Sequence, residues 1–220
     1  MKITITKCIQ GLMLVASLSG GSMANAIVIY TDATAFQNDN VVTFVTTPSG
    51  GGNGTVAGSL AFTNGPSASI VFGNFTNLLQ NELGISDIEN FNVNISGGAY
   101  AFGFDVTDPQ SSSLPNGCNV NSCIDSVFSF SIFDSNTLIG SFSFDPLFSD
   151  SVVSFVGVYS NVLFNRVEIR ETFGTNDNEY FGNFQLSTVR QSVSEPEFLM
   201  FYSLSIFLLL SFRRKLNRFS

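Results

Sequence analysis

The stretch FSFSIF, residues 128–133, alternates large apolar side chains with serine. Successive side chains of a β-strand point to opposite faces, so this alternation gives one apolar face and one hydroxylated face. The same pattern returns in FSF, residues 142–144. Both runs therefore predict strands that are buried on one side only, as in a sheet that covers a hydrophobic core.

Similar short runs of phenylalanine, valine and isoleucine occur along the chain, separated by glycine, asparagine and serine. Aromatic and β-branched residues fit a pleated, half-buried surface. The strands expected from these runs cover residues 27–31, 41–46, 55–63, 69–72, 88–95, 100–106, 126–133, 137–144, 152–159, 166–171 and 178–186, while residues 74–83 are expected to be irregular or briefly helical. Many short strands without a long helical period predict an all-β fold, a two-sheet antiparallel β-sandwich of the jelly-roll-like kind.

The chain is long enough for one sizeable domain. It has 220 residues, of which 44% are hydrophobic, with 24 Phe and no Trp. This composition supports a substantial core. We expect one β-sandwich over residues 27–186, followed by a small polar linker at residues 187–193.

The charge of the central region is strongly negative. All 17 acidic residues lie between Asp32 and Glu197, and the basic residues in that region are Arg166, Arg170 and Arg190, which leaves a formal charge of −14. Nucleic-acid binding depends on Lys and Arg that neutralise phosphates. We therefore exclude nucleic acid as a partner.

The residue types of the chain do not favour a catalytic function. The chain has no histidine, so a Ser-His-Asp or Cys-His arrangement is impossible. Two carboxylates could still hydrolyse a glycosidic bond, but no pair among the acids stands out. The sequence predicts that the protein is not an enzyme, with a polysaccharide-active hydrolase as the weakest alternative.

The N-terminus predicts a secretory signal peptide over residues 1–26. Lys2 and Lys7 precede an apolar run at residues 9–16, and the small residues Ala24 and Ala26 form an A-x-A cleavage site. A short buried helix is the alternative interpretation. Export through the inner membrane, with cleavage after Ala26 by signal peptidase, follows from the first interpretation.

The C-terminus predicts a single hydrophobic helix at residues 198–212, followed by a basic tail at residues 213–220. The apolar run is shorter than the roughly 20 residues of a usual membrane span. Arg213 and Arg214 favour a cytoplasmic position for the tail. This pattern predicts a membrane contact that lasts at least until the tail is processed.

Residues 194–220 resemble the PEP-CTERM sorting signal. Glu195 and Pro196 match its motif, Ser194 stands where the motif has its first proline, and the helix and basic tail follow. The resemblance implies processing by exosortase and delivery to the cell surface or extracellular matrix of an exopolysaccharide-producing, biofilm-forming bacterium. A plain single-pass anchor is the alternative. Residues 100–106, 155–160 and 176–182 are also similar to jelly-roll-like ectodomains of PEP-CTERM proteins, which implies the same fold here.

Cys118 and Cys123 are the cysteines that remain after removal of the signal peptide. An even pair in an exported chain indicates a disulfide. Two free thiols, or half of a metal site, are the alternatives.

Asp177, Asn178 and Glu179 form an acidic cluster just before the last expected strand, and Asp32 follows the first one. Calcium prefers several oxygen ligands in a flexible site. The position resembles the calcium site of carbohydrate-binding sandwich modules, so these four residues are a candidate calcium site. A polar turn in which Asp and Asn cap their own backbone is the alternative.

Two further groups are candidates for ligand binding. Asp105, Asp108 and Asp125 surround the loop at residues 109–124 and could form a binding rim, although a solvated hairpin explains them as well. The tyrosines could form a shallow platform for a sugar ring, whereas most phenylalanines belong to the core. The tyrosines are Tyr30, Tyr100, Tyr159, Tyr180 and Tyr202.

These observations lead to one main hypothesis and one alternative. The main hypothesis is an exported, exosortase-sorted protein of the envelope or matrix, with a structural or adhesive role. The alternative is a calcium-dependent carbohydrate-binding module. In both cases an exopolysaccharide or another glycan is the expected partner outside the cell.

Overall fold

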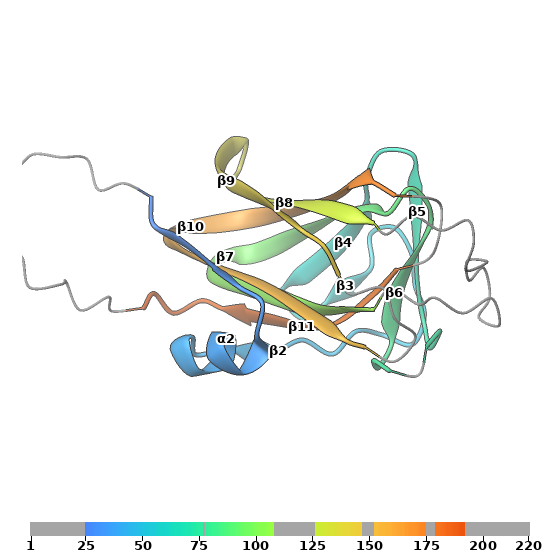
Figure 1. Cartoon of the computed structure of the whole chain (residues 1–220), viewed down its shortest axis with the longest axis horizontal. Helices are drawn as coiled ribbons and strands as arrows, with labels where there is room; N and C mark the ends of the chain where they lie inside the picture. The colour runs from blue at the N-terminus through green and yellow to red at the C-terminus, as the bar shows by residue number, and fades with distance from the viewer. Residues whose placement is uncertain (1–24, 77, 108–125, 147–151, 175–178, 192–220) are drawn as a thin grey trace, which may run out of the picture. The chain divides into compact units, whose positions relative to one another are not determined.

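The computed structural model describes residues 25–76, 78–107, 126–146, 152–174 and 179–191 (Figure 1). Every strand pairing in this part of the chain is antiparallel. The elements are β1 (Ile27–Tyr30), α2 (Ala33–Asp39), β2 (Thr43–Phe44), β3 (Val56–Ala57), β4 (Leu60–Asn64), β5 (Ala68–Gly73), β6 (Glu82–Asp87), β7 (Asn90–Thr107), β8 (Val127–Asp134), β9 (Thr137–Phe144), β10 (Ser154–Phe173) and β11 (Tyr180–Ser187).

Two long strands, β7 and β10, connect the layers of the fold. The first half of β7 pairs with the second half of β10, and the second half of β7 pairs with the first half of β10. The register shifts between Tyr159 and Arg166, and β7 carries Gly97 and Gly98 with φ of +80° and +75° at the same level. Glycine adopts these positive φ values without steric cost, so the paired strands can bend there and enter a second layer.

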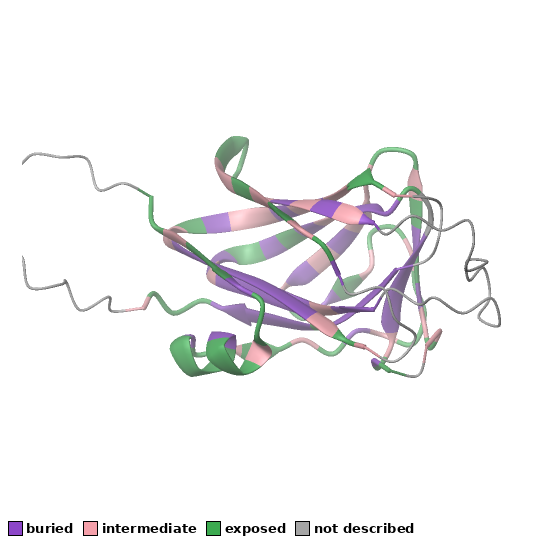
Figure 2. Cartoon of the chain, viewed as in Figure 1, coloured by how far each residue is buried: buried purple, intermediate pink, exposed green. Residues whose placement is uncertain are grey.

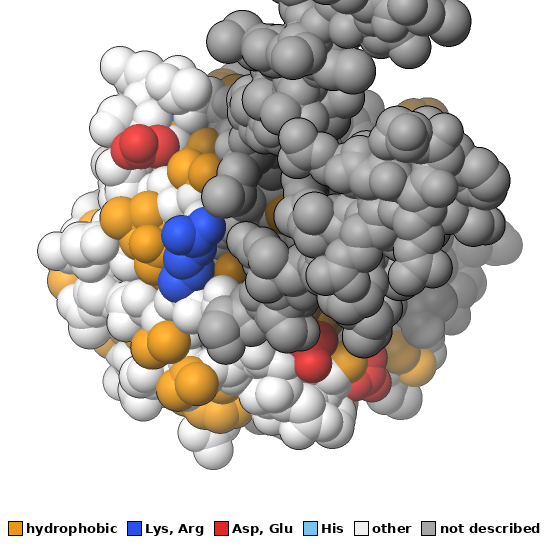
Figure 3. Space-filling model, turned by 90° about the vertical axis from the view of Figure 1, so that its left-hand side faces the viewer, with side chains coloured by type: hydrophobic (Ala, Val, Ile, Leu, Met, Phe, Trp, Pro, Cys, Tyr) orange, Lys and Arg blue, Asp and Glu red, His pale blue; other side chains and the backbone are white. Residues whose placement is uncertain are grey.

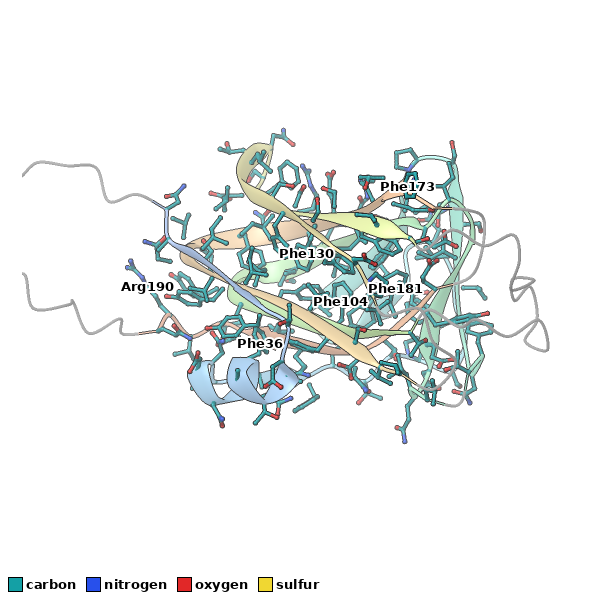
Figure 4. The ribbon with its side chains drawn as sticks, in the orientation of Figure 1. Phe36, Phe104, Phe130, Phe173, Phe181 and Arg190 are labelled. Carbon is teal, nitrogen blue, oxygen red and sulfur yellow. The ribbon has the colours of Figure 1, made fainter. Side chains whose placement is uncertain are left out.

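The bend produces two sheets. One has the order β5-β6-β11-β7-β10-β1, with β2 beside the end of β11, and the other has the order β3-β4-β7-β10-β8-β9. Phenylalanine rings join the two sheets: Phe104 stacks on Phe130 with ring centres 5.8 Å apart, and Phe181 lies 4.9 Å from Phe91. Figure 2 shows buried residues along the facing sides of the strands, and Figure 4 shows Phe104, Phe130 and Phe181 between the layers. The predicted all-β, two-sheet antiparallel sandwich is confirmed.

A smaller apolar cluster lies on the outer face of the first sheet, under α2. Phe36 of α2 is fully buried and packs against Tyr30 and Phe155, with ring centres 5.3 Å away in both cases. Gly157 pairs with Gly103 beneath these rings. A Cβ on Gly157 would lie 2.9 Å from the Phe36 ring, so glycine is needed for this close approach.

The expected elements differ from the observed ones in six places. The strand expected at residues 55–63 is two strands, β3 and β4, and the one expected at 41–46 is reduced to β2. The strands expected at residues 88–95 and 100–106 are one strand, β7, and those at 152–159 and 166–171 are one strand, β10. The helix α2 was not predicted, and β6 begins at Glu82, inside the segment expected to be irregular. In β7 and β10 the glycines and the polar residues at the bend interrupt the alternation without ending the pairing.

The chain divides by its internal contacts into two compact units, Met1–Arg190 and Gln191–Ser220. Every described element and both apolar clusters belong to the first unit, so residues 25–190 contain the complete described core. Within the described residues, no helix has the length and apolar character needed to cross a membrane. The expected helix at residues 198–212, the cysteine pair and most of the signal peptide lie outside the described residues.

Candidate functional site

A cleft of about 520 Å³ opens beside β1 and β9, the edge strands of the two sheets on the same side of the sandwich. Both strands cross the near side of the molecule in Figure 1. Residues from the end of β1, the start of α2, the end of β7, the end of β9 and the start of β10 line it. We call it the β1–β9 cleft.

The ends of the strands explain why the cleft forms there. β1 stops at Tyr30, opposite Gly157, so Ser154–Val156 of β10 pair only with β7 in the described part of the chain. Further along, the Ile27 side chain occupies the place where a Cβ on Gly140 of β9 would lie. The two sheet edges therefore touch at one end and separate at the other.

The cleft combines carboxylates, hydroxyls and apolar walls. Its carboxylates belong to Asp32, Asp105 and Asp145. Its hydroxyls come from Thr31, Thr34, Ser143 and Ser154, and its apolar walls include Ile29, Phe144, Pro146 and Phe155. Carboxylates accept hydrogen bonds, hydroxyls both donate and accept them, and the walls exclude water from a ligand's apolar side.

Asp32 has a structural role in addition to its place in the cleft. Its Oδ1 accepts a hydrogen bond of 2.6 Å from the backbone N–H of Ala35, which makes Asp32 the N-cap of α2. N-capping satisfies a backbone donor at the start of a helix. The cap fixes the position of the Asp32 carboxylate in the cleft.

Asp105 also lines the cleft and is half-buried. The Asn183 side chain donates a hydrogen bond of 2.8 Å to its Oδ2. Asn183 has a φ of +48° at a bulge in β11, between Gly182 and Gln185, which turns its side chain toward Asp105. Burial raises the pKa of the Asp105 carboxyl, and the bond from Asn183 lowers it.

The structure separates the predicted calcium ligands. Asp32 lies in the cleft, whereas Glu179 is fully buried just before β11, where its charge raises the pKa of Glu89. Asp177 and Asn178 lie outside the described residues. In the part of the chain that the structure covers, no three Asp, Glu, Cys or His side chains form a metal-binding group. Calcium binding by these four residues stays a prediction.

Glu89 is a buried acid that no pattern in the sequence indicated. It is fully buried before β7, and its backbone N–H donates a 3.0 Å hydrogen bond to Glu171 near the end of β10. Burial raises the pKa of the Glu89 carboxyl far above its ordinary value of 4.5, and the carboxylates of Glu179 and Glu171 raise it further. Glu89 is therefore protonated and neutral at neutral pH.

Glu82, another fully buried acid, has a different environment. Its carboxylate accepts hydrogen bonds from the backbone N–H groups of Phe75 at 2.5 Å, Thr76 at 2.7 Å and Leu79 at 3.3 Å. These bonds hold the turn before β6. We assign Glu82 a structural role.

The other predicted sites have mixed outcomes. The tyrosine platform is wrong for Tyr30, Tyr159 and Tyr180, which are buried, while Tyr100 is partly buried. Of the aromatic residues in the described ranges, Phe44 and Phe173 are the exposed ones, at 59% and 60%. Beyond the described residues lie Asp108, Asp125, Cys118, Cys123, Tyr202, Ala24, Ser194, Glu195, Pro196, Arg213 and Arg214.

The negative charge is unevenly distributed over the surface. Figure 3 views the end of the sandwich that lies at the left of Figure 1, and hydrophobic side chains surround a basic group there. Arg190, which is exposed, lies at this end (Figure 4). The cleft, in contrast, gathers three aspartates.

No protein-family model matches the chain, and no curated protein matches its sequence. Similar solved structures are carbohydrate-binding modules. A lysine-to-alanine variant of a family 29 module has 12% identity and a TM-score of 0.42, over 67% of this chain and 91% of that one. An aspartate-to-alanine variant of the same module, in complex with mannohexaose, has 13% identity and a TM-score of 0.41, with the same coverage.

The family 11 module from Clostridium thermocellum, in complex with a β-1,3-1,4-mixed-linked tetrasaccharide, has 9% identity and a TM-score of 0.36, over 68% of this chain and 97% of that one. All three TM-scores are below 0.5. The description of this chain as a sandwich therefore rests on its own strand pairing and core contacts.

Proposed function

We propose that the β-sandwich is a carbohydrate-binding domain and that it holds a neutral oligosaccharide in the β1–β9 cleft. The observation that carries this proposal is the combination of three carboxylates and four hydroxyls with apolar walls in one cleft. A sugar ring presents hydroxyl groups at its edge and C–H groups on its faces. Aspartates accept hydrogen bonds from the hydroxyls, and the partly buried ring of Phe144 can cover a C–H face.

The charge of the cleft selects the class of glycan. The carboxylates of Asp32, Asp105 and Asp145 repel a uronic acid or a sulfated sugar, and the negative charge of the whole central region adds to this repulsion. A neutral glycan meets no such barrier. The preference for neutral over acidic glycans distinguishes this cleft from a general polysaccharide-binding surface.

We infer binding without bond cleavage. The chain lacks histidine, and burial raises the pKa of Asp105 although the hydrogen bond from Asn183 lowers it in part. A general acid for glycoside hydrolysis needs a strongly raised pKa. Asp105 already uses one carboxylate oxygen to accept the hydrogen bond from Asn183, an arrangement suited to holding a polar ligand group in place.

The cellular context of this domain follows from the chain ends. We propose export with cleavage after Ala26, transient attachment by residues 198–212, and release by exosortase near Glu195. A glycan-binding domain delivered in this way would hold exopolysaccharide at the cell surface or in the matrix. This role agrees with the structural or adhesive function expected from the sequence.

Mass spectrometry of the protein isolated from its producing cells tests the sorting proposal. The signals at the two ends predict a mature chain that begins at Ile27 and lacks the apolar helix at residues 198–212. A mature chain that still contains the helix contradicts processing by exosortase. It leaves the proposal of glycan binding unaffected, because the cleft lies in residues 29–156.

Replacing Asp105 with asparagine is expected to weaken glycan binding at least about tenfold, because a hydrogen bond to a charged acceptor contributes about 1.5–3 kcal/mol. The change keeps the shape of the side chain. The measurement is calorimetric titration of residues 25–190 with mannohexaose and with the mixed-linked tetrasaccharide, after a screen on immobilised neutral and acidic glycans.

Asp134→Asn is the matched control, since Asp134 is an exposed aspartate at the end of β8, outside the cleft. It should bind as the unmodified protein does. Equal affinities for the Asp105 variant and the unmodified protein would place the binding surface elsewhere.

The same titrations with added calcium and with EDTA test the predicted calcium dependence.

A further inference from the structure

A second groove, of about 430 Å³, opens on the side of the sandwich opposite the β1–β9 cleft. Its walls are β2 and the end of β11 from the first sheet, and the turn between β3 and β4 from the second sheet. In the strand orders, β2 and β3 lie on the β7 side of the β7–β10 pair, whereas β1 and β9 lie on the β10 side. We call it the β2–β3 groove.

Short pairings explain the shape of the groove. β2 pairs with Gln185 and Leu186 of β11, and the N–H of Val45 donates a 2.8 Å hydrogen bond to the Phe184 carbonyl. Across the groove, Gly58 has a φ of +57° at the tight turn between β3 and β4, which glycine adopts without steric cost. A Cβ on Gly58 would lie 3.9 Å from Cγ1 of Val45, so the two walls approach each other there.

The groove exposes an aromatic ring. Phe44 is 59% exposed and lines the groove together with Val45 and Leu186. Among the aromatic residues of the described ranges, Phe173 is the other one with such exposure, and it lies outside both the groove and the cleft. A ring exposed beside a groove gives the C–H face of a sugar ring a flat apolar surface to lie on.

Four hydroxyl groups of the groove are available to a ligand. Within the described residues, none of them has a hydrogen-bond partner in the protein, whereas serine hydroxyls of the second sheet bond one another, as Ser131 and Ser141 do at 2.8 Å. A hydroxyl both donates and accepts, so it can pair with the hydroxyls of a sugar in either direction. The four belong to Thr43, Thr46, Ser59 and Thr188.

No charged residue lines the groove. An acidic glycan would therefore find no cation to pair with, and the negative charge of the central region opposes its approach. A neutral glycan meets neither obstacle. Hydrogen bonds between neutral groups are weaker than those to a carboxylate, so the groove should bind such a glycan less tightly than the cleft does.

We propose that the β2–β3 groove is a second glycan-binding site, which takes a short stretch of a neutral polysaccharide, and that each domain thereby bridges two polysaccharide chains. Four strand spacings, roughly 19 Å, separate β2 from β1 across the first sheet. The two sites open on opposite sides of the sandwich, so different chains can enter them. The bridging rests on the proposed function of the cleft, whereas the groove is tested by itself.

Titration of isotope-labelled residues 25–190 with mannohexaose and with the mixed-linked tetrasaccharide tests the groove. The amide shifts of Thr46, Ser59 and Thr188 should follow a binding curve of their own, weaker than that of the cleft. Phe44→Ala should weaken this curve at least about fivefold, because the sugar loses the apolar surface that the ring provides. The curve of the cleft should stay unchanged in this variant.

Phe173→Ala is the matched control, since its ring is 60% exposed and lies outside both sites; it should leave both curves intact. Asp105→Asn should weaken the curve of the cleft alone, so a failure of one site is distinguished from a failure of the other. Groove shifts that respond to neither glycan, or equally in the Phe44 variant, would overturn the proposal. So would shifts that follow protein concentration instead, because they would assign the groove to self-association.

Light scattering from mixtures of the domain with soluble mannan or mixed-linked β-glucan tests the bridging. The unmodified domain should raise the scattering, because two sites on one molecule connect separate chains. Phe44→Ala and Asp105→Asn should each abolish most of the rise, while Phe173→Ala should keep it. No rise with the unmodified domain, or the same rise with the Phe44 variant, would overturn the bridging.

Discussion

Replacing Phe104 with alanine is expected to lower the free energy of unfolding by about 3–5 kcal/mol. Phe104 is fully buried and lies between the two sheets. Its ring contacts those of Phe91, Phe102, Phe130, Phe144, Phe181 and Phe184. These rings belong to both sheets, so they cannot close around the vacated space without separating from their own neighbours.

The measurement is unfolding of residues 25–190 by guanidinium chloride, followed by circular dichroism. Phe44→Ala is the matched control: its ring is 59% exposed, so the loss should stay below about 0.5 kcal/mol. Similar losses for the two variants would show that the phenylalanines between the sheets do not form the stabilising core described here.

Stability is expected to fall by about 1.4 kcal/mol per pH unit between about pH 6 and pH 8, because Glu89 stays protonated in the folded protein. Its raised pKa means that the folded state holds a proton that the unfolded state releases above pH 4.5. The stabilisation is complete below that pH and is lost as the pH rises. The chain has no histidine, so no imidazole titrates in this range.

Glu89→Gln should remove this pH dependence, because glutamine is neutral at every pH. At about pH 8 the variant should be roughly 3–5 kcal/mol more stable than the unmodified protein. Glu168→Gln is the control, since Glu168 forms ion pairs with Arg166 at 3.1 Å and Arg170 at 3.0 Å; it should keep the slope. Denaturant midpoints across the pH range provide the measurement, and an unchanged slope in the Glu89 variant would contradict the assignment.

The strands that the sequence predicts well are those with a local signal. The alternation of FSFSIF becomes β8, whose Phe128 and Phe130 are fully buried while its serines are partly exposed. The bends in β7 and β10 could not be predicted in this way. Gly97 and Gly98 are typical of a break between strands, and whether pairing continues past them depends on β10, more than fifty residues further along the chain.

The helix α2 is too short to be recognised from the spacing of its apolar residues. It has seven residues and one buried side chain, Phe36, which is too little for a helical pattern to be recognised. Asp32 as an N-cap is the local feature that could have indicated it.

The candidate site was only partly predictable for a different reason. Asp32 and Asp105 were selected from sequence on separate grounds, and the fold brings both to the β1–β9 cleft. Asp145 and Ser143 were not selected, because their role arises only when β9 comes to lie beside β1. Glu89 likewise could not be selected from sequence. The residues beside it, Glu171 near the end of β10 and Glu179 just before β11, are far from it along the chain, so no local pattern shows that they meet.

A neutral glycan is proposed to bind between β1 and β9. The most direct measurement is a titration of isotope-labelled residues 25–190 with mannohexaose and the mixed-linked tetrasaccharide, followed through the amide chemical shifts. We expect the largest changes at Thr31, Asp105 and Ser143, which line the cleft. Unchanged shifts with every neutral glycan tested, or changes confined to β5 at the opposite edge, would contradict it.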